Sequence, residues 1–541
     1  MVTTEYPQPV AAAWVATAVV AWLLAAGPAN AQQVYPTTPD WVSADTQVST
    51  GGALVDLNGD GWLDLVVANG NDMAQQRLVV YHGLGNGSLP TLPTWQSADL
   101  AYNGHLDVAD VNGDGWPDVA VAYLGEFSTT GPIARVYLNN AGTLSSTADW
   151  SADVSGNAFG LAFGDLNNDG RPDLAVATGW PYSNPNAYYN YVYLNVGGQL
   201  QTPAAWQSSD RNDYMGALWV DADDDGWLDL ACVGARTEAR IYRNVGGALE
   251  TTASWSTADN PNPYAIMAAA GDVTGDGLRD LFVTDNTQLA GGTGRFRQYN
   301  GLAGGFFTTT PQWFFHSSQH AYGSAVALAD LNGDGRLDLV TGAWWSRTRL
   351  FLNHGSGFNT APSWLSTPSS VVEKIVFGDL NRDGLRPVVE TFGVTTPRQL
   401  FYLSHQPIQQ VLSVRMDGVE LTPAEYAFNR ENGWVTVPAA PVALLRVEYT
   451  CSSRLDMAVT NWDNTVGNHL YYHQYAAPGD ANCDGRLDEG DIPFFVLLLV
   501  NRSAYDQALP DCDALATCDL SGDGLLDGRD LQPFVSLLAG E

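Results

Sequence analysis

The chain is short of basic residues. Its 541 residues include 24 Lys and Arg against 59 Asp and Glu, the net charge is −35 at pH 7, and Lys374 is the only lysine. No segment gathers the positive charge that binding to nucleic acid or to an anionic membrane surface requires, so we expect neither as a partner. Five cysteines are too few for a disulfide framework in a chain of this length.

Long apolar runs are also scarce. Outside residues 10–27, no stretch is long and apolar enough to span a bilayer. Ala29-Asn30-Ala31 follows this run as an A-x-A-like cleavage site, which predicts a signal peptide over residues 1–31. The mature protein would then be secreted, extracellular or at the cell surface, without a membrane span. Because the segment before the run lacks Lys and Arg and contains Glu5, an uncleaved membrane anchor stays open as the alternative.

Catalytic motifs are missing as well. The sequence has neither a G-x-S-x-G nor an H-E-x-x-H pattern, and its eight histidines are scattered along the chain. We therefore assign no catalytic residue.

What the chain does contain is a repeat. The nine-residue pattern Asp-x-Asn-x-Asp-Gly-x-x-Asp, with some substitutions, recurs at a mean period of about 54 residues, which is typical of propellers and solenoids. Its seven copies open at Asp56, Asp110, Asp165, Asp221, Asp272, Asp330 and Asp379. Oxygen side chains at positions 1, 3, 5 and 9 suit a hard cation such as Ca²⁺, and Gly at position 6 permits a sharp turn.

Short apolar runs around each motif predict β-strands. For the third copy, residues 161–164 precede the motif and residues 174–176 follow it, and residues 192–195 predict a third strand. A fourth strand carries a tryptophan in every repeat: Trp41, Trp95, Trp150, Trp206, Trp255, Trp313 and Trp364. Four strands repeated seven times predict an all-β propeller, in which the tryptophans pack between neighbouring blades.

Over roughly residues 35–405 the chain resembles the FG-GAP/VCBS repeat family, whose best-known relatives are the integrin α-subunit propellers. The resemblance implies a calcium-binding β-propeller with metal loops on one face and ligand-binding loops on the other. The implied ligands are Asp56, Asn58, Asp60, Asp64, Asp110, Asn112, Asp114, Asp118, Asp165, Asn167, Asp169, Asp173, Asp221, Asp223, Asp225, Asp229, Asp272, Thr274, Asp276, Asp280, Asp330, Asn332, Asp334, Asp338, Asp379, Asn381 and Asp383. Pro387 stands where the last Asp of the seventh copy belongs, so we expect that site to be weaker or empty.

The regular spacing of the repeat is lost near its end. We assign residues 32–410 to the propeller, 411–450 to a small all-β insert, and 451–474 to returning propeller strands. The segment around Trp41 is expected to complete the last blade and close the ring. Either the insert interrupts blade seven or a metal-free eighth blade exists, and we prefer seven blades.

The C-terminal residues 475–541 contain two EF-hand-type loops, each followed by an apolar segment that predicts a short helix. Their candidate ligands are Asp480, Asn482, Asp484, Asp488, Asp491, Asp519, Ser521, Asp523, Asp527 and Asp530. Asp at position 12 and the duplication resemble a type I dockerin, which implies a cohesin-like partner. At the recognition positions 10 and 11 the loops have Glu489-Gly490 and Gly528-Arg529, and not the small hydroxyl pair of cellulosomal dockerins. The alternative is a terminal domain that metal merely stabilises.

Cysteine usage in this module leaves two pairings open. Cys483 and Cys512 flank the two loops and could form a disulfide there, with Cys518 as a competing partner.

Aromatic residues near the loops opposite the metal loops suggest a ligand surface, because such side chains suit sugar stacking or a protein contact. The candidates are Tyr102, Tyr214, Tyr264, Tyr322, Trp180, Trp344 and Trp345. The alternative is that these rings only plug the central channel.

Together these features predict a secreted propeller that binds about six to nine calcium ions. It would act as a binding or adhesion protein for an extracellular protein or carbohydrate, with its tail attached to a partner. The alternative is a polysaccharide-active enzyme, a lyase or hydrolase that uses the aromatic face. A lyase would need a base there, and Lys374, the only lysine, stands just before the seventh motif.

Overall fold

The computed structural model describes residues 34–125, 131–179, 188–260, 263–288, 291–355, 357–393, 396–474, 479–482, 487–509, 512, 514–521 and 525–539. The chain divides into two compact units, Pro36–His473 and a second one that contains Gln474–Glu541. The predicted signal peptide lies outside the described residues.

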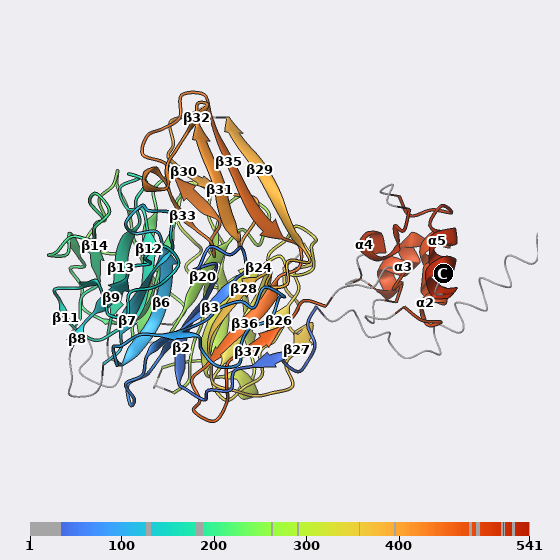
Figure 1. Cartoon of the computed structure of the whole chain (residues 1–541), viewed down its shortest axis with the longest axis horizontal. Coiled ribbons are helices and arrows are strands. Elements are labelled where there is room, and N and C mark those ends of the chain that lie inside the picture. Colours follow the sequence, from blue (N-terminus) through green and yellow to red (C-terminus); the bar gives the residue numbers. More distant parts are fainter. Residues whose placement is uncertain are drawn as a thin grey trace, which may run out of the picture. The chain divides into compact units, whose positions relative to one another are not determined.

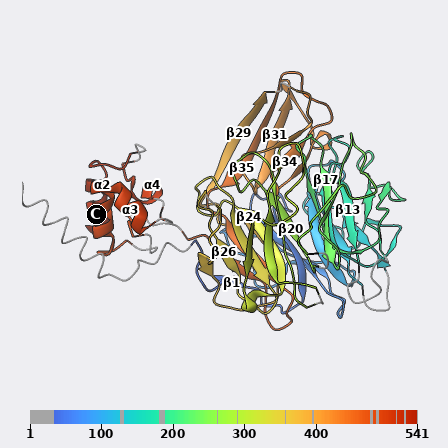
Figure 2. The same cartoon turned by 180° about the vertical axis from the view of Figure 1, so that it is seen from behind.

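Four-stranded antiparallel sheets recur along Pro36–His473 (Figures 1 and 2). In the described part of this unit seven sheets repeat one pattern, in which the motif joins the first strand to the second. Six of them take their strands in chain order. The first sheet consists of β2 (Ser49–Val55), β3 (Asp64–Asn69), β4 (Leu78–Tyr81) and β5 (Trp95–Gln96), and the second of β6 (Asn103–Ala109), β7 (Asp118–Tyr123), β9 (Ala134–Tyr137) and β10 (Trp150–Ser151). The third consists of β12 (Ala158–Gly164), β13 (Asp173–Thr178), β14 (Tyr191–Tyr193) and β15 (Trp206–Gln207), and the fourth of β16 (Asp213–Val220), β17 (Asp229–Ala235), β18 (Arg240–Tyr242) and β19 (Trp255–Ser256). The fifth consists of β20 (Ala268–Gly271), β21 (Asp280–Val283), β22 (Arg295–Tyr299) and β23 (Trp313–His316), and the sixth of β24 (Gly323–Ala329), β25 (Asp338–Ala343), β26 (Arg349–Phe351) and β27 (Trp364–Leu365). Between them lie a small ribbon of β8 (Gly131–Pro132) and β11 (Ser155–Gly156), and the 3₁₀ turn η1 (Ser318–His320).

The remaining sheet of this type joins the two ends of the unit. It is formed by β28 (Val372–Gly378), β36 (Asp456–Asn461), β37 (His469–Tyr471) and the N-terminal β1 (Trp41–Val42). The first strands of successive sheets contact one another in chain order from β2 to β28, and β28 also contacts β2. The strand around Trp41 therefore completes the last sheet as predicted, and the order of contacts returns to its start.

Tryptophans pack the sheets against one another. In six of the seven repeats the tryptophan of the fourth strand makes an edge-to-face contact, at centroid distances of 5.0 to 6.1 Å, with an aromatic ring on the third strand of the next sheet. The pairs are Trp41–Tyr81, Trp150–Tyr193, Trp206–Tyr242, Trp255–Tyr299, Trp313–Phe351 and Trp364–Tyr471. The predicted packing role is confirmed, and the apolar core lies between neighbouring sheets.

Buried asparagines give a second link between repeats. Asn139, Asn195, Asn244 and Asn353 follow third strands and are at most 1% exposed. The Asn139 Nδ2 donates to the carbonyl of Leu57, in the motif of the preceding repeat, at 2.8 Å, and to that of Pro117, in its own motif, at 3.2 Å. The other three repeat this geometry. Each amide thus satisfies two buried carbonyl groups that belong to different motif loops.

The insert is longer than predicted. It begins at β29 (Leu385–Gly393) and ends at β35 (Leu444–Ser452), which pair along their whole length, and so the predicted bounds of 411–450 are wrong. One sheet contains β29, β35, β31 (Gln410–Met416) and β32 (Val419–Glu420), and the other β30 (Leu400–Tyr402), β34 (Trp434–Thr436) and β33 (Ala427–Asn429), with the 3₁₀ turn η2 (Pro423–Glu425) beside them. Residues 385–389 follow a motif, and the second-strand position that this suggests is filled by β36, which pairs with β28. The insert strands extend beyond the repeated sheets (Figure 1).

The described residues of the C-terminal unit form helices. These are α2 (Asp491–Val500), α3 (Arg502–Ala508), α4 (Ala514–Cys518) and α5 (Leu531–Ala539). The short helices predicted after the two loops are confirmed as α2 and α5, whose Phe495 and Phe534 rings stack at a centroid distance of 3.8 Å. Cys512 is disulfide-bonded and Cys518 is free, which excludes the Cys518 pairing, while Cys483 lies outside the described residues.

Asn139→Ala tests the asparagine link. The change leaves two buried carbonyl groups without their donor, and we expect the free energy of unfolding to fall by about 1–3 kcal/mol. Asn140→Ala, at the exposed neighbouring position, is the matched control and should change stability by less than about 0.5 kcal/mol. Urea unfolding of both variants measures the difference, and equal stabilities would contradict the proposed role of Asn139.

Candidate metal centres

The motif forms a tight loop because its first aspartate accepts backbone donors from the turn. Asp56 Oδ1 accepts the N–H of Gly59 at 2.8 Å, and Oδ2 accepts that of Gly61 at 2.9 Å. Both glycines have positive φ, 71° and 85°, a conformation that side chains disfavour. Asn58 Nδ2 donates to Asp60 Oδ2 at 3.0 Å, so the side chains of positions 3 and 5 lie together.

The last aspartate of the motif opens the second strand and ties the loop to the sheet. Asp64 Oδ2 accepts the N–H of Leu57 at 3.0 Å, and Oδ1 accepts that of Gly83 at 2.8 Å. The same bonds recur at Asp118, Asp173, Asp229, Asp280 and Asp338. In repeats one to six the structure therefore brings the predicted residues together in one repeated geometry.

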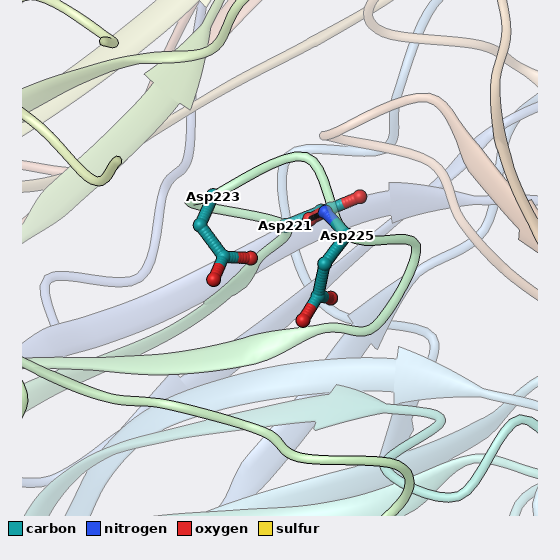
Figure 3. A group of neighbouring side chains, drawn as sticks. All are labelled: Asp221, Asp223 and Asp225. Carbon is teal, nitrogen blue, oxygen red and sulfur yellow. Dashed lines mark hydrogen bonds between the residues drawn. The ribbon is translucent and has the colours of Figure 1, made fainter. Parts of the chain in front are cut away.

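The fourth copy has the densest charge. Asp221, Asp223 and Asp225 come from one short loop between β16 and β17 (Figure 3), and each offers an oxygen within 4.8 Å of the others. Arg243 Nη2 lies 2.7 Å from an Asp223 oxygen and 3.4 Å from one of Asp225, so it balances part of this charge.

The seventh copy is completed from across the insert. Asp456, at the start of β36, accepts the N–H of Leu380 at 2.8 Å through Oδ2 and that of His473 at 2.8 Å through Oδ1. These are the roles of Asp64 in the first repeat, so Asp456 fills the position that Pro387 occupies in the sequence. The predicted gap in this donor set is wrong, because 69 inserted residues separate the two parts of the motif. Leu455-Asp456-Met457 resembles Leu63-Asp64-Leu65, and that signal could have identified it.

Burial and mutual repulsion raise the pKa values of these carboxyl groups toward neutral pH. Burial, with neighbouring loop carboxylates adding to it, raises the pKa of Asp64 and of Asp456 to about 7 and that of Asp229 to about 8. Crowded, buried carboxylates with amide oxygens beside them are the donor set that a hard divalent cation prefers. The loops of the repeats thus fit calcium.

Both loops of the C-terminal unit use their twelfth residue in the same way. Asp491 accepts the N–H groups of Asn482 at 3.0 Å and Asp488 at 2.8 Å. Asp530 accepts those of Ser521 and Asp527, both at 2.9 Å. Asp480 and Asp519 open these loops, while the predicted ligands Asp484 and Asp523 lie outside the described residues. The described geometry supports a duplicated loop.

Most of the predicted ligand-binding aromatics are buried. Tyr102, Tyr214, Tyr264 and Trp344 are at most 9% exposed, which contradicts their assignment to an exposed surface, and Trp180 lies outside the described residues. Their positions explain the burial. The Tyr214 hydroxyl donates to Asp210 at 2.6 Å. Tyr264 and Trp344 belong to one apolar cluster that draws residues from six of the seven repeats. These two rings are therefore packing residues of that cluster.

Two of the predicted aromatics are exposed. Trp345 is 62% and Tyr322 is 36% exposed, and their rings meet edge to face at 5.3 Å. Trp345 has φ 53°, a strained value for a side chain of this size. The pair lies at the end of the sheet opposite its motif loop, since Tyr322 precedes the first strand β24 and Trp345 follows the second strand β25.

The insert packs against the motif loops, which sequence reasoning missed. The Tyr402 hydroxyl accepts the N–H of Asp221 at 3.0 Å, and Gln399 Nε2 donates to the carbonyl of Asn168 at 2.8 Å. Gln406 Nε2 donates to the carbonyl of Ala270, at the end of β20, at 2.8 Å. Loops from several repeats thus meet one inserted domain.

The fold and these loops define a repeat protein with the sheet arrangement of a β-propeller and oxygen-rich loops at one end of its inner strands. The chain belongs to the FG-GAP-like repeat family. Residues 56–121, 124–176, 221–283, 272–341 and 330–386, more than half of the chain, match the FG-GAP-like repeat, and residues 102–145 match the FG-GAP repeat.

Integrin α subunits share part of this sequence. Integrin alpha-3 of Cricetulus griseus is 32% identical over 149 residues, which are 24% of this chain and 14% of that protein. Integrin alpha-6 of Gallus gallus is 37% identical over 113 residues, 18% of this chain and 10% of that protein. This chain therefore spans only a small part of these relatives. The structure of Saccharomyces cerevisiae Sqt1 aligns at a TM-score of 0.42 and 10% identity, over 82% of this chain and 99% of that one.

None of the helices in the described part of the chain has the length and apolarity that crossing a membrane requires.

With divalent ions chelated, the protein should lose stability as pH rises from 5 to 8. The loop aspartates have folded pKa values near 7, above the value of the unfolded chain, so the folded state holds extra protons between about pH 4 and pH 7. That advantage is present at pH 5 and lost by pH 8. We expect a fall of at least about 2 kcal/mol, measured by urea unfolding in EDTA. A free energy of unfolding that rises over this range would contradict the assignment.

Proposed function

We propose that the protein is a secreted, calcium-binding, seven-bladed β-propeller that works as a binding or adhesion protein. The observation that carries the proposal is the repeated loop geometry, which recurs in seven copies when Asp456 is counted. The ring of contacts between first strands supports closure by seven blades, with the insert inside the last one. Integrin α subunits, which share these repeats, are the precedent for adhesion.

Calcium would stabilise the ring by neutralising the loops. Each repeat places several carboxylates in one turn, and the chain as a whole carries a charge of −35. With seven loops in the propeller and two in the tail, the chain would take about six to nine ions. Since such sites form only in the folded state, ion binding adds directly to the free energy of unfolding. Extracellular calcium concentrations suit sites of this kind.

The exposed Tyr322–Trp345 pair is the best candidate for ligand contact. A rigid aromatic platform offers contact area at low entropic cost, to a sugar face or to a protein side chain. The motif loops are less suitable because their side-chain oxygens would be spent on calcium and the insert covers part of them. We therefore propose an extracellular protein or carbohydrate ligand at the end opposite the metal loops.

The tail would attach the propeller to a partner as a dockerin does. Ile492, Val496 and Val500 lie four residues apart on α2 and are exposed, and Leu531 and Val535 repeat the pattern on α5. Exposed apolar stripes of this kind mark docking surfaces. A cohesin-like partner fits this duplicated arrangement.

An enzymatic role finds less support. Lys374, the only lysine, forms an ion pair with Glu431 at 2.8 Å between the propeller and the insert. Its ammonium group is therefore already engaged, and we retain binding as the function.

Asp456→Asn tests the calcium assignment. Removing this donor should lower the number of bound ions by one, measured by equilibrium dialysis of the full chain, and chelation should lower the melting temperature of the wild type by more than about 10 °C. Asp463→Asn, a half-buried acidic position in the loop after the same strand, is the control and should keep the full number. An unchanged ion count in Asp456→Asn, or a melting curve that EDTA does not move, would refute the seven-site reading.

Replacing both Tyr322 and Trp345 by Ala tests the ligand surface. We expect glycan-array or cell-surface binding by the calcium-loaded protein to weaken by about 1–4 kcal/mol, a typical range for aromatic hot spots. The melting temperature should hardly change because both rings are exposed. Trp344→Ala, at the buried neighbour, should instead cost about 3–5 kcal/mol of stability. If the double variant binds like the wild type, the ligand lies elsewhere.

A further inference from the structure

A polar cavity of about 370 Å³ lies between the insert and the loops of repeats five and six. Thr274 and Gly275 line it from the fifth loop, and Gly333 and Gly335 from the sixth. Residues 404–407 of the insert form the opposite wall. Its volume is in the range of small-molecule sites, and it lies on the face opposite the Tyr322–Trp345 pair.

Two guanidinium groups of this cavity have no carboxylate partner in the described part of the chain. Arg279 stacks over the Tyr402 ring at 4.2 Å. Arg386 has its Nη2 3.4 Å from His405 Nε2. Neither belongs to any salt bridge among the described residues, although acidic residues outnumber basic ones more than two to one. Arg336 also lines the cavity, but it is paired with Asp334.

His405 adds to the positive charge. Hydrogen bonds to Cys451 and Glu390 raise the pKa of His405 to about 9, so the ring is cationic at neutral pH. Its Nδ1 contacts the Tyr449 hydroxyl at 2.6 Å, which leaves Nε2 on the side of Arg386. A Glu390 oxygen lies 3.9 Å from the same Nδ1 and balances the charge of His405, whereas Arg386 has no carboxylate beside it in the described part of the chain.

The acidic residues in the wall do not pair with the two guanidinium groups. Asp272 accepts the N–H groups of Gly275 and Gly277 at 2.7 and 2.8 Å, and Asp330 accepts those of Gly333 and Gly335 at 2.9 and 2.8 Å. These carboxylates are turned into their own loops.

We propose that this cavity binds a small hydroxylated carboxylate of the size of a sugar acid, with Arg279 and Arg386 holding the carboxylate. A guanidinium group offers paired donors whose geometry matches a carboxylate. Ser404 and Ser453 line the same cavity and provide hydroxyl groups for the hydroxyls of the ligand. The ligand would join the insert to the propeller, because Arg386 belongs to the first and Arg279 to the second.

Titration calorimetry of the full, calcium-loaded chain with galacturonate tests the proposal, with galactose as the neutral counterpart. Galacturonate should bind and galactose should not. Arg386→Gln, at an exposed position of β29, should weaken galacturonate binding about tenfold or more, and Arg279→Gln should do the same, since hydrogen bonds to a charged group are the stronger ones. Arg415→Gln, on β31 of the same sheet, is the matched control and should bind like the wild type.

Equal binding of galactose and galacturonate would overturn the anion site. Unchanged affinity in both Arg386→Gln and Arg279→Gln would also overturn it, provided that the variants keep the melting temperature of the wild type. Binding of an acidic peptide without binding of galacturonate would show that the cavity serves a protein partner, against the proposal. Displacement of galacturonate by inorganic sulfate would support it, because sulfate shares only the negative charge.

Discussion

The crowding of carboxylates in the motif loops is the constraint on which the rest of the structure depends. Each loop gathers three or more oxygen side chains, yet its backbone donors fold it into a single turn, as the bonds of Asp56 to Gly59 and Gly61 show. Burial raises the pKa of the last aspartate, so its charged form is costly without a balancing charge nearby. The loops join the first two strands of every sheet, and therefore the state of these groups bears on the whole ring.

Neighbouring repeats are joined by two kinds of side-chain contact. In six of the seven repeats the tryptophan of the fourth strand packs on an aromatic ring of the next sheet, and in four of them a buried asparagine after the third strand donates to a carbonyl of the preceding loop. The tryptophan contact buries apolar surface, while the asparagine hydrogen bond satisfies backbone acceptors that water cannot reach. Because both act between sheets, no repeat is complete alone, which is the general condition of repeat proteins.

The insert shows that a motif can survive a long interruption. Its ends, Leu385 and Ser452, pair with each other, so the chain leaves the seventh loop and returns to it at nearly the same place. Asp456 then takes the bonds that the last aspartate makes elsewhere. An excursion of this kind costs little entropy when its ends are already held together. The insert also covers part of the end of the repeats where the motif loops lie, and it forms one wall of a cavity there.

The repeat, the four strands of each copy, the loop residues and the helices after the two C-terminal loops could be predicted from the sequence, because they follow from local patterns of apolar, glycine and acidic residues. The packing role of the tryptophans could also be predicted, since it is tied to their strand position. The true ends of the insert, the place of Asp456 and the burial of Tyr214, Tyr264 and Trp344 became visible only in the folded chain. These depend on contacts between residues far apart in the chain: the pairing of β29 with β35, and the meeting of several sheets around one cluster. A local pattern shows that an aromatic residue is present, but whether its ring faces water depends on what the other repeats bring against it.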